Sequence, residues 1–142
     1  MGKVMTRIRL TNSMDREKAF AGELDTSEVR SETIEALVDT GATTLAIPED
    51  VARRLGVRFA GTRNVRMASG ERHAIPWVAG VHLEILGRDM TCDALVLPVG
   101  VPALIGQIPL EALDLIVDPK NREVRVNPES PDAPLLDLYA VA

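Results

Sequence analysis

Short apolar runs that end at glycines or polar turns constrain the fold of this chain more than any other feature. In several runs apolar and polar residues alternate, and the other runs are apolar throughout and only a few residues long. A period of two over so few residues is typical of β-strands, and Gly61, Gly70, Gly80 and Gly87 are predicted to mark turns between them. The runs lie at 1–11, 32–40, 43–47, 65–67, 73–77, 81–85, 90–97, 103–105, 114–118, 122–126 and 135–141. Many short strands of this kind predict an all-β fold, either a barrel or a sandwich.

Two short helices are predicted between the strands. Pro48 suits the first position of a helix over 48–55, which Gly56 ends. A single helical turn is expected at 109–113, after a second Ile-Pro pair. Residues 12–30 are polar and are predicted to form a loop or a hairpin turn, and the proline-rich segment 127–134 is predicted to be extended.

Length and charge exclude several classes of protein. The 142 residues predict one domain, 1–142, and the net charge of −5 argues against a nucleic-acid partner or an anionic membrane surface. No apolar run is long enough to cross a bilayer, and residues 1–10 lack the pattern of a secretion signal. The single cysteine, Cys92, excludes an internal disulfide, so a cytoplasmic location is expected.

Asp39 is the unusual side chain, because a carboxylate directly follows the apolar residues 36–38 at the end of a predicted strand. Charges at such positions are uncommon unless something pairs with them or uses them. Thr40 adds a hydroxyl group, and Gly41 allows a sharp turn whose N–H groups can reach the carboxylate. When the tripeptide is considered alone, an aspartate that caps its own turn is the favoured explanation.

Three motifs that follow one another along the chain favour a functional role for Asp39 over a simple turn cap. They are Ala36-Leu37-Val38-Asp39-Thr40-Gly41-Ala42, a hairpin with Met67-Ala68-Ser69-Gly70-Glu71 at its tip, and Ala103-Leu104-Ile105-Gly106. In sequence and spacing they resemble the retroviral-type (retropepsin-like) aspartic proteases, and most of all the small bacterial members. The resemblance covers about residues 30–118. It implies a closed β-barrel with a flap hairpin and one or two short helices, and an aspartic endopeptidase that needs no cofactor.

Hydrolysis by this chemistry requires two carboxylates that share one proton, with the ionised member activating a water molecule. The chain offers one such group, Asp39. Asp25 lies in a polar stretch and Asp118 precedes a proline, so both are predicted to be turn residues. The second carboxylate is therefore expected from another copy, in a two-fold homodimer that acts on a peptide or protein substrate.

The resemblance also implies roles for the neighbours of Asp39. Thr40 would contact its counterpart in the second copy across the two-fold axis, and Gly41 would complete the catalytic motif. The expected substrate-binding residues are Ala42, Met67, Ala68, Ser69 and Gly70. An ordinary surface hairpin is the alternative for residues 67–70, and Trp77 behind it is predicted to pack in the core.

The remaining candidates have simpler explanations. His73 and His82 lack neighbours that could complete a metal site, so no metal is expected, and Cys92 is predicted to be a half-buried strand thiol. Two rival functions remain open. One is a peptide-binding module of the same fold with little or no proteolysis, and the other is an unrelated β-barrel in which Asp39 only caps a turn.

Overall fold

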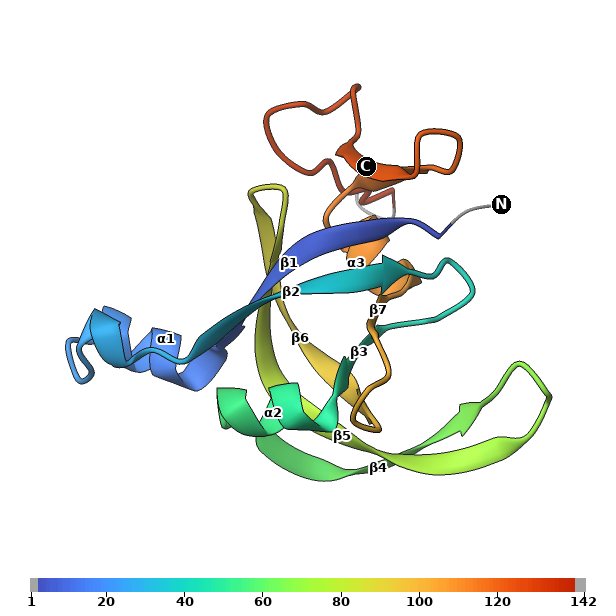
Figure 1. Cartoon of the computed structure of the whole chain (residues 1–142). Coiled ribbons are helices and arrows are strands. Elements are labelled where there is room, and N and C mark those ends of the chain that lie inside the picture. Colours follow the sequence, from blue (N-terminus) through green and yellow to red (C-terminus); the bar gives the residue numbers. More distant parts are fainter. Residues whose placement is uncertain (1–2, 140–142) are drawn as a thin grey trace.

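The computed structural model of the chain describes residues 3–139 (Figure 1). Nine strands alternate with short helices, and a 3₁₀ turn, η1, lies at Thr26–Glu28. The elements are β1 (Met5–Asn12), α1 (Ser13–Phe20), β2 (Ser31–Val38), β3 (Leu45–Pro48), α2 (Glu49–Leu55), β4 (Arg58–Arg66), β5 (Arg72–Ile85), β6 (Arg88–Leu97), β7 (Ala103–Ile105), α3 (Gln107–Ala112), β8 (Leu115–Asp118) and β9 (Glu123–Val126). Among these residues no helix is long and apolar enough to span a membrane.

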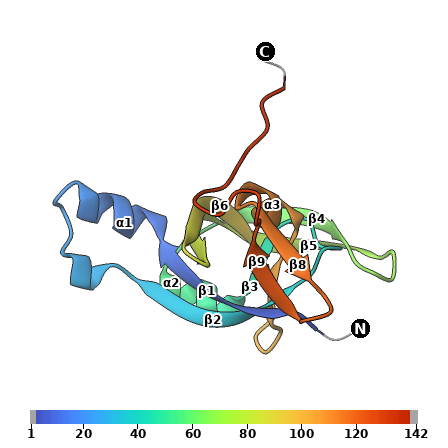
Figure 2. The same cartoon turned by 90° about the horizontal axis from the view of Figure 1, so that it is seen from above.

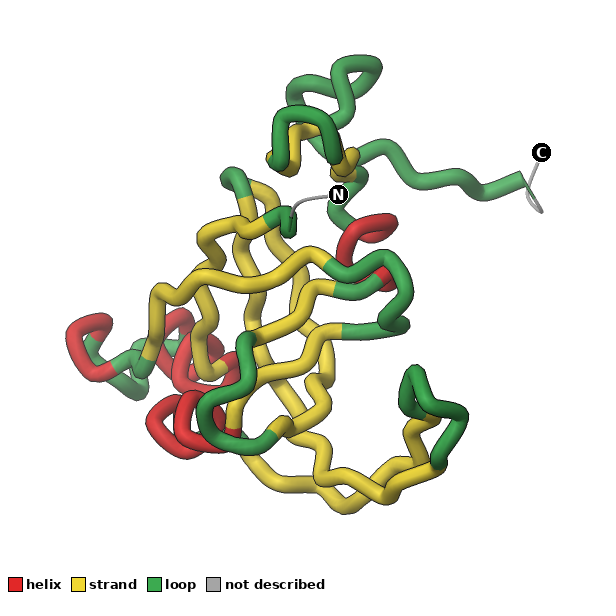
Figure 3. Tube along the Cα trace, turned by 45° about the vertical axis from the view of Figure 1, so that its right-hand side comes forward, coloured by secondary structure: helices red, strands yellow, loops and turns green. Residues whose placement is uncertain are grey.

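Six of the strands close into a barrel (Figure 3). Their order is β1-β2-β7-β3-β6-β5, and β1 also pairs with β5, which joins the two ends of the sheet. Closure leaves these six strands without a free edge, apart from the parts of β5 that extend beyond the barrel. The all-β fold, with a closed barrel and a few short helices, is therefore confirmed.

The core fills the barrel with aliphatic side chains from alternate strand positions. The largest fully buried ones include Ile8, Leu10, Leu45, Ile47, Leu83, Ile85 and Ile105. Burial of each such side chain stabilises the fold by roughly 2 kcal/mol. The predicted alternation in 1–11 is seen directly in β1, where Ile8 and Leu10 are buried and Arg7 and Arg9 are exposed.

Two of the predicted glycine turns are wrong. Gly80 lies inside β5, which runs without a break where two strands were expected, and Gly61 lies inside β4. The strand register shifts at both places, between Val78 and Val81 and between Phe59 and Gly61. Each glycine has a positive φ and serves a β-bulge, which bends a strand without ending it. The turns expected at Gly70 and Gly87 are present.

Segment 12–30 is also not the loop that was predicted, because it contains α1 and η1. Asn12 caps α1 by accepting a hydrogen bond from the Asp15 N–H (3.0 Å), and it donates to the Leu55 carbonyl (2.9 Å). Asp15 is only 6% exposed and pairs with the Arg30 guanidinium (Nε–Oδ2 2.8 Å). Hydrogen bonds from Arg30 hold the pKa of Asp15 below its usual value. These polar anchors, rather than an apolar face, hold the helix against the barrel.

The two predicted helices are confirmed with shifted starts. Pro48 is the residue before α2 rather than its first residue, and Gly56 ends the helix with φ 66°. The helix α3 begins at Gln107, two residues earlier than expected, with Pro109 in its first turn. With α1, the chain has three short α-helices in its described part.

Beyond α3 the chain leaves the barrel. The strands predicted at 114–118 and 122–126 are present as β8 and β9, which form an antiparallel pair separate from the barrel, and the tail then extends away from the body (Figure 2). Asp114 holds the start of this tail: its carboxylate accepts hydrogen bonds from Ser130, from the Asn127 amide (3.1 Å) and from the Leu135 N–H (3.0 Å). The strand predicted over 135–141 is absent from Leu135–Tyr139, and the rest of that range lies outside the described residues.

Candidate functional site

Asp39 lies in the loop 39–44, directly after β2, a strand in which Ala36 is buried and the other residues are half-buried or exposed. Its side chain is half-buried, and its Oδ1 accepts a hydrogen bond from the Gly41 N–H (2.9 Å). The backbone N–H of Asp39 donates to the Ile105 carbonyl (2.9 Å), and the Ala42 N–H donates to the Asp39 carbonyl (3.0 Å). Within residues 3–139 the Oδ2 atom accepts no hydrogen bond from the protein, which leaves it available to a water molecule or a second acid.

The Ala103-Leu104-Ile105-Gly106 motif packs against this loop and supports it. Strands β2 and β7 run parallel, with Leu37 opposite Leu104 and Val38 opposite Ile105. A Cβ atom on Gly106 would lie 2.6 Å from the Thr44 N and O atoms and 2.7 Å from the Ala42 carbonyl oxygen. Only glycine allows the two segments to approach this closely, so the Leu-Ile-Gly motif sets the position of the Asp39 loop.

The start of α3 adds two further hydrogen bonds that the sequence did not reveal. The Gln107 N–H donates to the Ala42 carbonyl (2.9 Å), and the Ile108 N–H donates to the Thr43 carbonyl (2.8 Å). In the sequence, the segment around Asp39 and the segment around Gly106 each contain an apolar strand, a glycine and then an Ile-Pro pair. This repeat was the available signal that the two segments lie together. The loop carrying Asp39 is thus pinned along its length by backbone groups of the second motif.

Thr40 faces an open surface. It is exposed and lines an open groove of about 830 Å³ together with residues of α3, β8 and the tail, among them Ile108, Leu115 and Leu136. Ile108 is 49% exposed and Leu136 is 64% exposed. Apolar side chains of this size beside a candidate catalytic loop mark a surface that a partner can cover.

Asp25 and Asp118 are turn residues, as predicted. The Asp25 carboxylate accepts hydrogen bonds from the N–H (2.9 Å) and Oγ (2.8 Å) of Ser27, and these bonds lower its pKa. The Asp118 carboxylate accepts from the N–H groups of Asn121 and Lys120 (3.1 Å each), with the Asn121 bond the main cause of its lowered pKa. Both carboxylates are committed to hydrogen bonds within local turns.

The predicted binding residues come from two separate places. Ala42 belongs to the Asp39 loop and is half-buried, whereas Met67, Ala68, Ser69 and Gly70 form the exposed turn between β4 and β5. In this turn the Gly70 N–H donates to the Met67 carbonyl (2.9 Å), and Gly70 has φ 89°. The turn and the loop lie on the same side of the barrel (Figure 1). Among the described residues no hydrogen bond joins them.

A family model described as "gag-polyprotein putative aspartyl protease" matches residues 26–112. The chain belongs to this aspartyl protease family. No curated protein matches the chain.

The matched range defines what the aspartyl protease family shares with this chain. It runs from η1 to the last residue of α3 and includes the Asp39 loop, the β4–β5 hairpin and Gly106. Strand β1, helix α1 and the β8–β9 pair lie outside it. Strand β1 is nevertheless part of the barrel, because it pairs with both β2 and β5 and closes the sheet.

The other titratable side chains of this aspartyl protease family member are placed as follows. His73 pairs with Glu71 at the hairpin turn (3.0 Å), and His82 is buried between Thr91 and Asp89. Across residues 3–139 no three His, Cys, Asp or Glu side chains come together as metal ligands.

Cys92 is half-buried on β6, as predicted, and burial raises the pKa of its thiol to about 11. Trp77 is half-buried under the Arg63 guanidinium rather than enclosed in the core.

Proposed function

We propose that the protein is an aspartic endopeptidase whose two catalytic carboxylates are the Asp39 residues of two copies. The observation that carries this proposal is the Asp39 loop itself. A half-buried carboxylate directly follows β2, Gly41 orients one of its oxygens, and a backbone contact at Gly106 holds the loop in place. Within residues 3–139 the other oxygen accepts no hydrogen bond from the protein. Membership of the aspartyl protease family supports the same assignment.

The chemistry follows from bringing two such groups together. Two carboxylates a few ångströms apart cannot both ionise, so the pair holds one proton over a range of acidic pH. The ionised member takes a proton from a water molecule, which attacks the scissile carbonyl, while the protonated member donates to the carbonyl oxygen. The pair titrates as a unit, and neither of its pKa values belongs to one chain.

Neighbouring residues supply the remaining parts of this proposal. Thr40 lies at the exposed end of the loop, where it would contact the partner's loop across the two-fold axis. The turn at residues 67–70 acts as a flap that closes over an extended substrate and excludes water. Ala42 and the turn residues would then pair with the substrate backbone as an added strand.

The test is cleavage of a mixed peptide library from pH 4 to 9 by the wild-type protein and by Asp39→Asn, with the oligomeric state measured by light scattering. We expect cleavage by the wild type alone, fastest at acidic pH, from a dimer. A strict monomer at the assay concentration would contradict the shared carboxylate pair, as would a rate that keeps climbing above pH 8. A dimer that cleaves nothing would instead favour a peptide-binding module of the same fold.

A further inference from the structure

The hairpin that extends beyond the barrel has the opposite charge to the rest of the chain. We call residues 58–77, which comprise β4, the turn and the start of β5, the overhang. It carries four arginines, Arg58, Arg63, Arg66 and Arg72, against one carboxylate, Glu71. The whole chain has 16 Lys and Arg against 21 Asp and Glu, so outside the overhang 12 basic side chains stand against 20 acidic ones.

The charges on one face of the overhang are already matched. Arg63 stacks on the Trp77 ring, with its Cζ 3.9 Å from the ring centroid, and its Nη2 lies 3.5 Å from the Asp93 carboxylate. His73 pairs with Glu71 at 3.0 Å. In the register of the hairpin Arg63 is opposite Ile75, and Val65 is opposite His73. Paired residues and those two positions further along a strand share a face, so these groups lie on one side.

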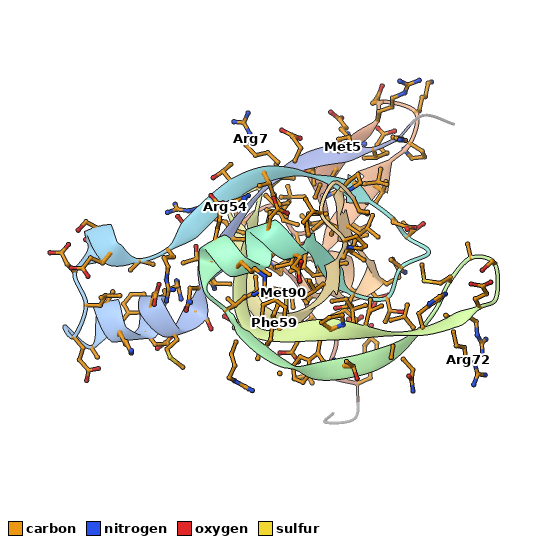
Figure 4. The ribbon with its side chains drawn as sticks, turned by 60° about the horizontal axis from the view of Figure 1, so that its bottom comes forward. Met5, Arg7, Arg54, Phe59, Arg72 and Met90 are labelled. Carbon is orange, nitrogen blue, oxygen red and sulfur yellow. The ribbon has the colours of Figure 1, made fainter. Side chains whose placement is uncertain are left out.

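Arg66 and Arg72 lie on the other face, and their charges are not matched. They are directly opposite each other in the register. In the part of the chain that the structure describes, neither has a carboxylate oxygen within the 4.0 Å of an ion pair. Two like charges at directly opposed positions destabilise a hairpin. The Arg72 side chain projects from the far end of the hairpin (Figure 4). An anion bound between the two arginines would relieve their repulsion.

Strand alternation relates this face to the barrel. Along β5, Arg72, Ala74 and Pro76 share a face with Val78, which is fully buried in the core. The face of a curved strand that points into a barrel is its concave face, and beyond the barrel the same face looks toward whatever the hairpin covers. The arginine pair therefore belongs to the face that the overhang turns toward a peptide held between the turn and the Asp39 loop.

We propose that Arg66 and Arg72 select peptide substrates that carry acidic side chains in the segment under the overhang. This inference deepens the proposed function and takes its cleavage step from it. An extended peptide is favoured over a nucleic acid or a membrane for two reasons. Strand β4 is an edge strand whose outer backbone groups have no strand partner within residues 3–139, and the acidic remainder of the chain repels long polyanions.

The experiment measures binding and cleavage separately. Short fluorescein-labelled peptides with glutamate at alternate positions are compared with peptides that carry glutamine at the same positions. Binding to the Asp39→Asn protein is measured by anisotropy at low and moderate salt, and cleavage by the active protein is measured with the same peptides. The test variant is Arg66→Gln/Arg72→Gln. The matched control is Arg7→Gln/Arg9→Gln, which removes two exposed arginines from one face of β1, away from the overhang.

We expect the glutamate peptide to bind about three- to twenty-fold more tightly than the glutamine peptide at low salt, with a smaller ratio at higher salt. The ratio falls to about one in Arg66→Gln/Arg72→Gln and persists in the control. An equal loss in both variants, or no preference in the wild type, would overturn the proposal. So would tighter, arginine-dependent binding of single-stranded RNA or anionic vesicles. Peptide binding is measured with a variant that does not cleave. A failed cleavage assay therefore counts against the endopeptidase alone, and the role of Arg66 and Arg72 is decided by the binding data.

Discussion

At the scale of single residues, burial decides which polar groups are reactive and which are structural. Asp39 is half-buried, and among the described residues one of its oxygens accepts no hydrogen bond, whereas both oxygens of Asp15, which is only 6% exposed, accept hydrogen bonds from Arg30. Cys92 illustrates the same rule for a thiol. Burial raises its pKa to about 11, so little thiolate is present near neutral pH, and its position on β6 gives it a packing role.

His82 makes the stability of the protein depend on pH. It is 6% exposed, with Nδ1 3.2 Å from Thr91 Oγ1 and Nε2 3.1 Å from Asp89 Oδ2. Burial lowers its pKa, and Arg16 and Arg9 act in the same direction against Asp89 and Glu84. As pH falls below about 6.5, the unfolded chain takes up the proton first. We expect the free energy of unfolding to decrease between pH 7 and pH 5.

Denaturant unfolding at a series of pH values checks this expectation. It is best carried out in the Asp39→Asn background, where the proposed carboxylate pair does not titrate. His82→Gln should flatten the slope between pH 7 and pH 5. The carboxylates with lowered pKa values, among them Asp15 and Asp114, affect stability only at lower pH. An unchanged slope in His82→Gln would show that this histidine is not the cause.

At the scale of elements, backbone contacts between distant segments position the candidate site. The β7–α3 segment supports the Asp39 loop through the β2–β7 pairing and through the close approach at Gly106. The residue before Asp39 and the residue before Gly106, Val38 and Ile105, are neighbours in that pairing. Two motifs far apart in the sequence thus form one rigid unit, and a disturbance in one of them moves the other.

Gly106→Ala tests this unit. Gly106 has an extended backbone conformation (φ −94°, ψ −169°) that alanine adopts freely, so the cost comes from the clash of the added methyl group with the Thr44 and Ala42 backbone. We expect a loss of about 3 kcal/mol or more in the free energy of unfolding, measured with denaturant. Gly22→Ala is the control. It has open space but φ 75°, so it should cost only about 1 kcal/mol. A loss at Gly106 no larger than the loss at Gly22 would contradict the close approach.

At the scale of the whole molecule, the proposed chemistry needs a second copy of the chain. The described surface near Thr40 is open and partly apolar, and it includes Ile108, Leu135 and Leu136. A two-fold dimer that covers this surface would bring the two Asp39 loops together. The repulsion between the two carboxylates then opposes assembly whenever both would be ionised.

Asp39→Asn should therefore strengthen the dimer at pH 7. The amide oxygen can still accept the Gly41 hydrogen bond, so the loop keeps its shape while the repulsion is removed. Sedimentation analysis should show a dissociation constant about tenfold lower than that of the wild type. Asp25→Asn removes the same charge from a distant turn and should have no effect on the dimer. A weaker dimer in Asp39→Asn would argue that the ionised carboxylate is a structural contact.

The local pattern of the sequence predicted most of the elements and the position of Asp39. Alternation and glycine placement depend on residues close together in the chain, so strands such as β1, β2 and β9 and the end of α2 at Gly56 were predicted near their observed places. The Asp39 motif was recognisable for the same reason. Its immediate neighbours, an apolar strand before it and a glycine after it, are local features.

Only the tertiary structure decided what depends on distant partners. Gly80 supports a bulge rather than a turn because β6 on one side continues to pair with β5 past it. Helix α1 has no apolar face to predict it and is held by contacts of Asn12 and Asp15 with Leu55 and Arg30. The position of the Asp39 loop likewise depends on the β2–β7 pairing and on the close approach of Gly106. Such pairing is set by the closure of the barrel, which no short stretch of sequence contains.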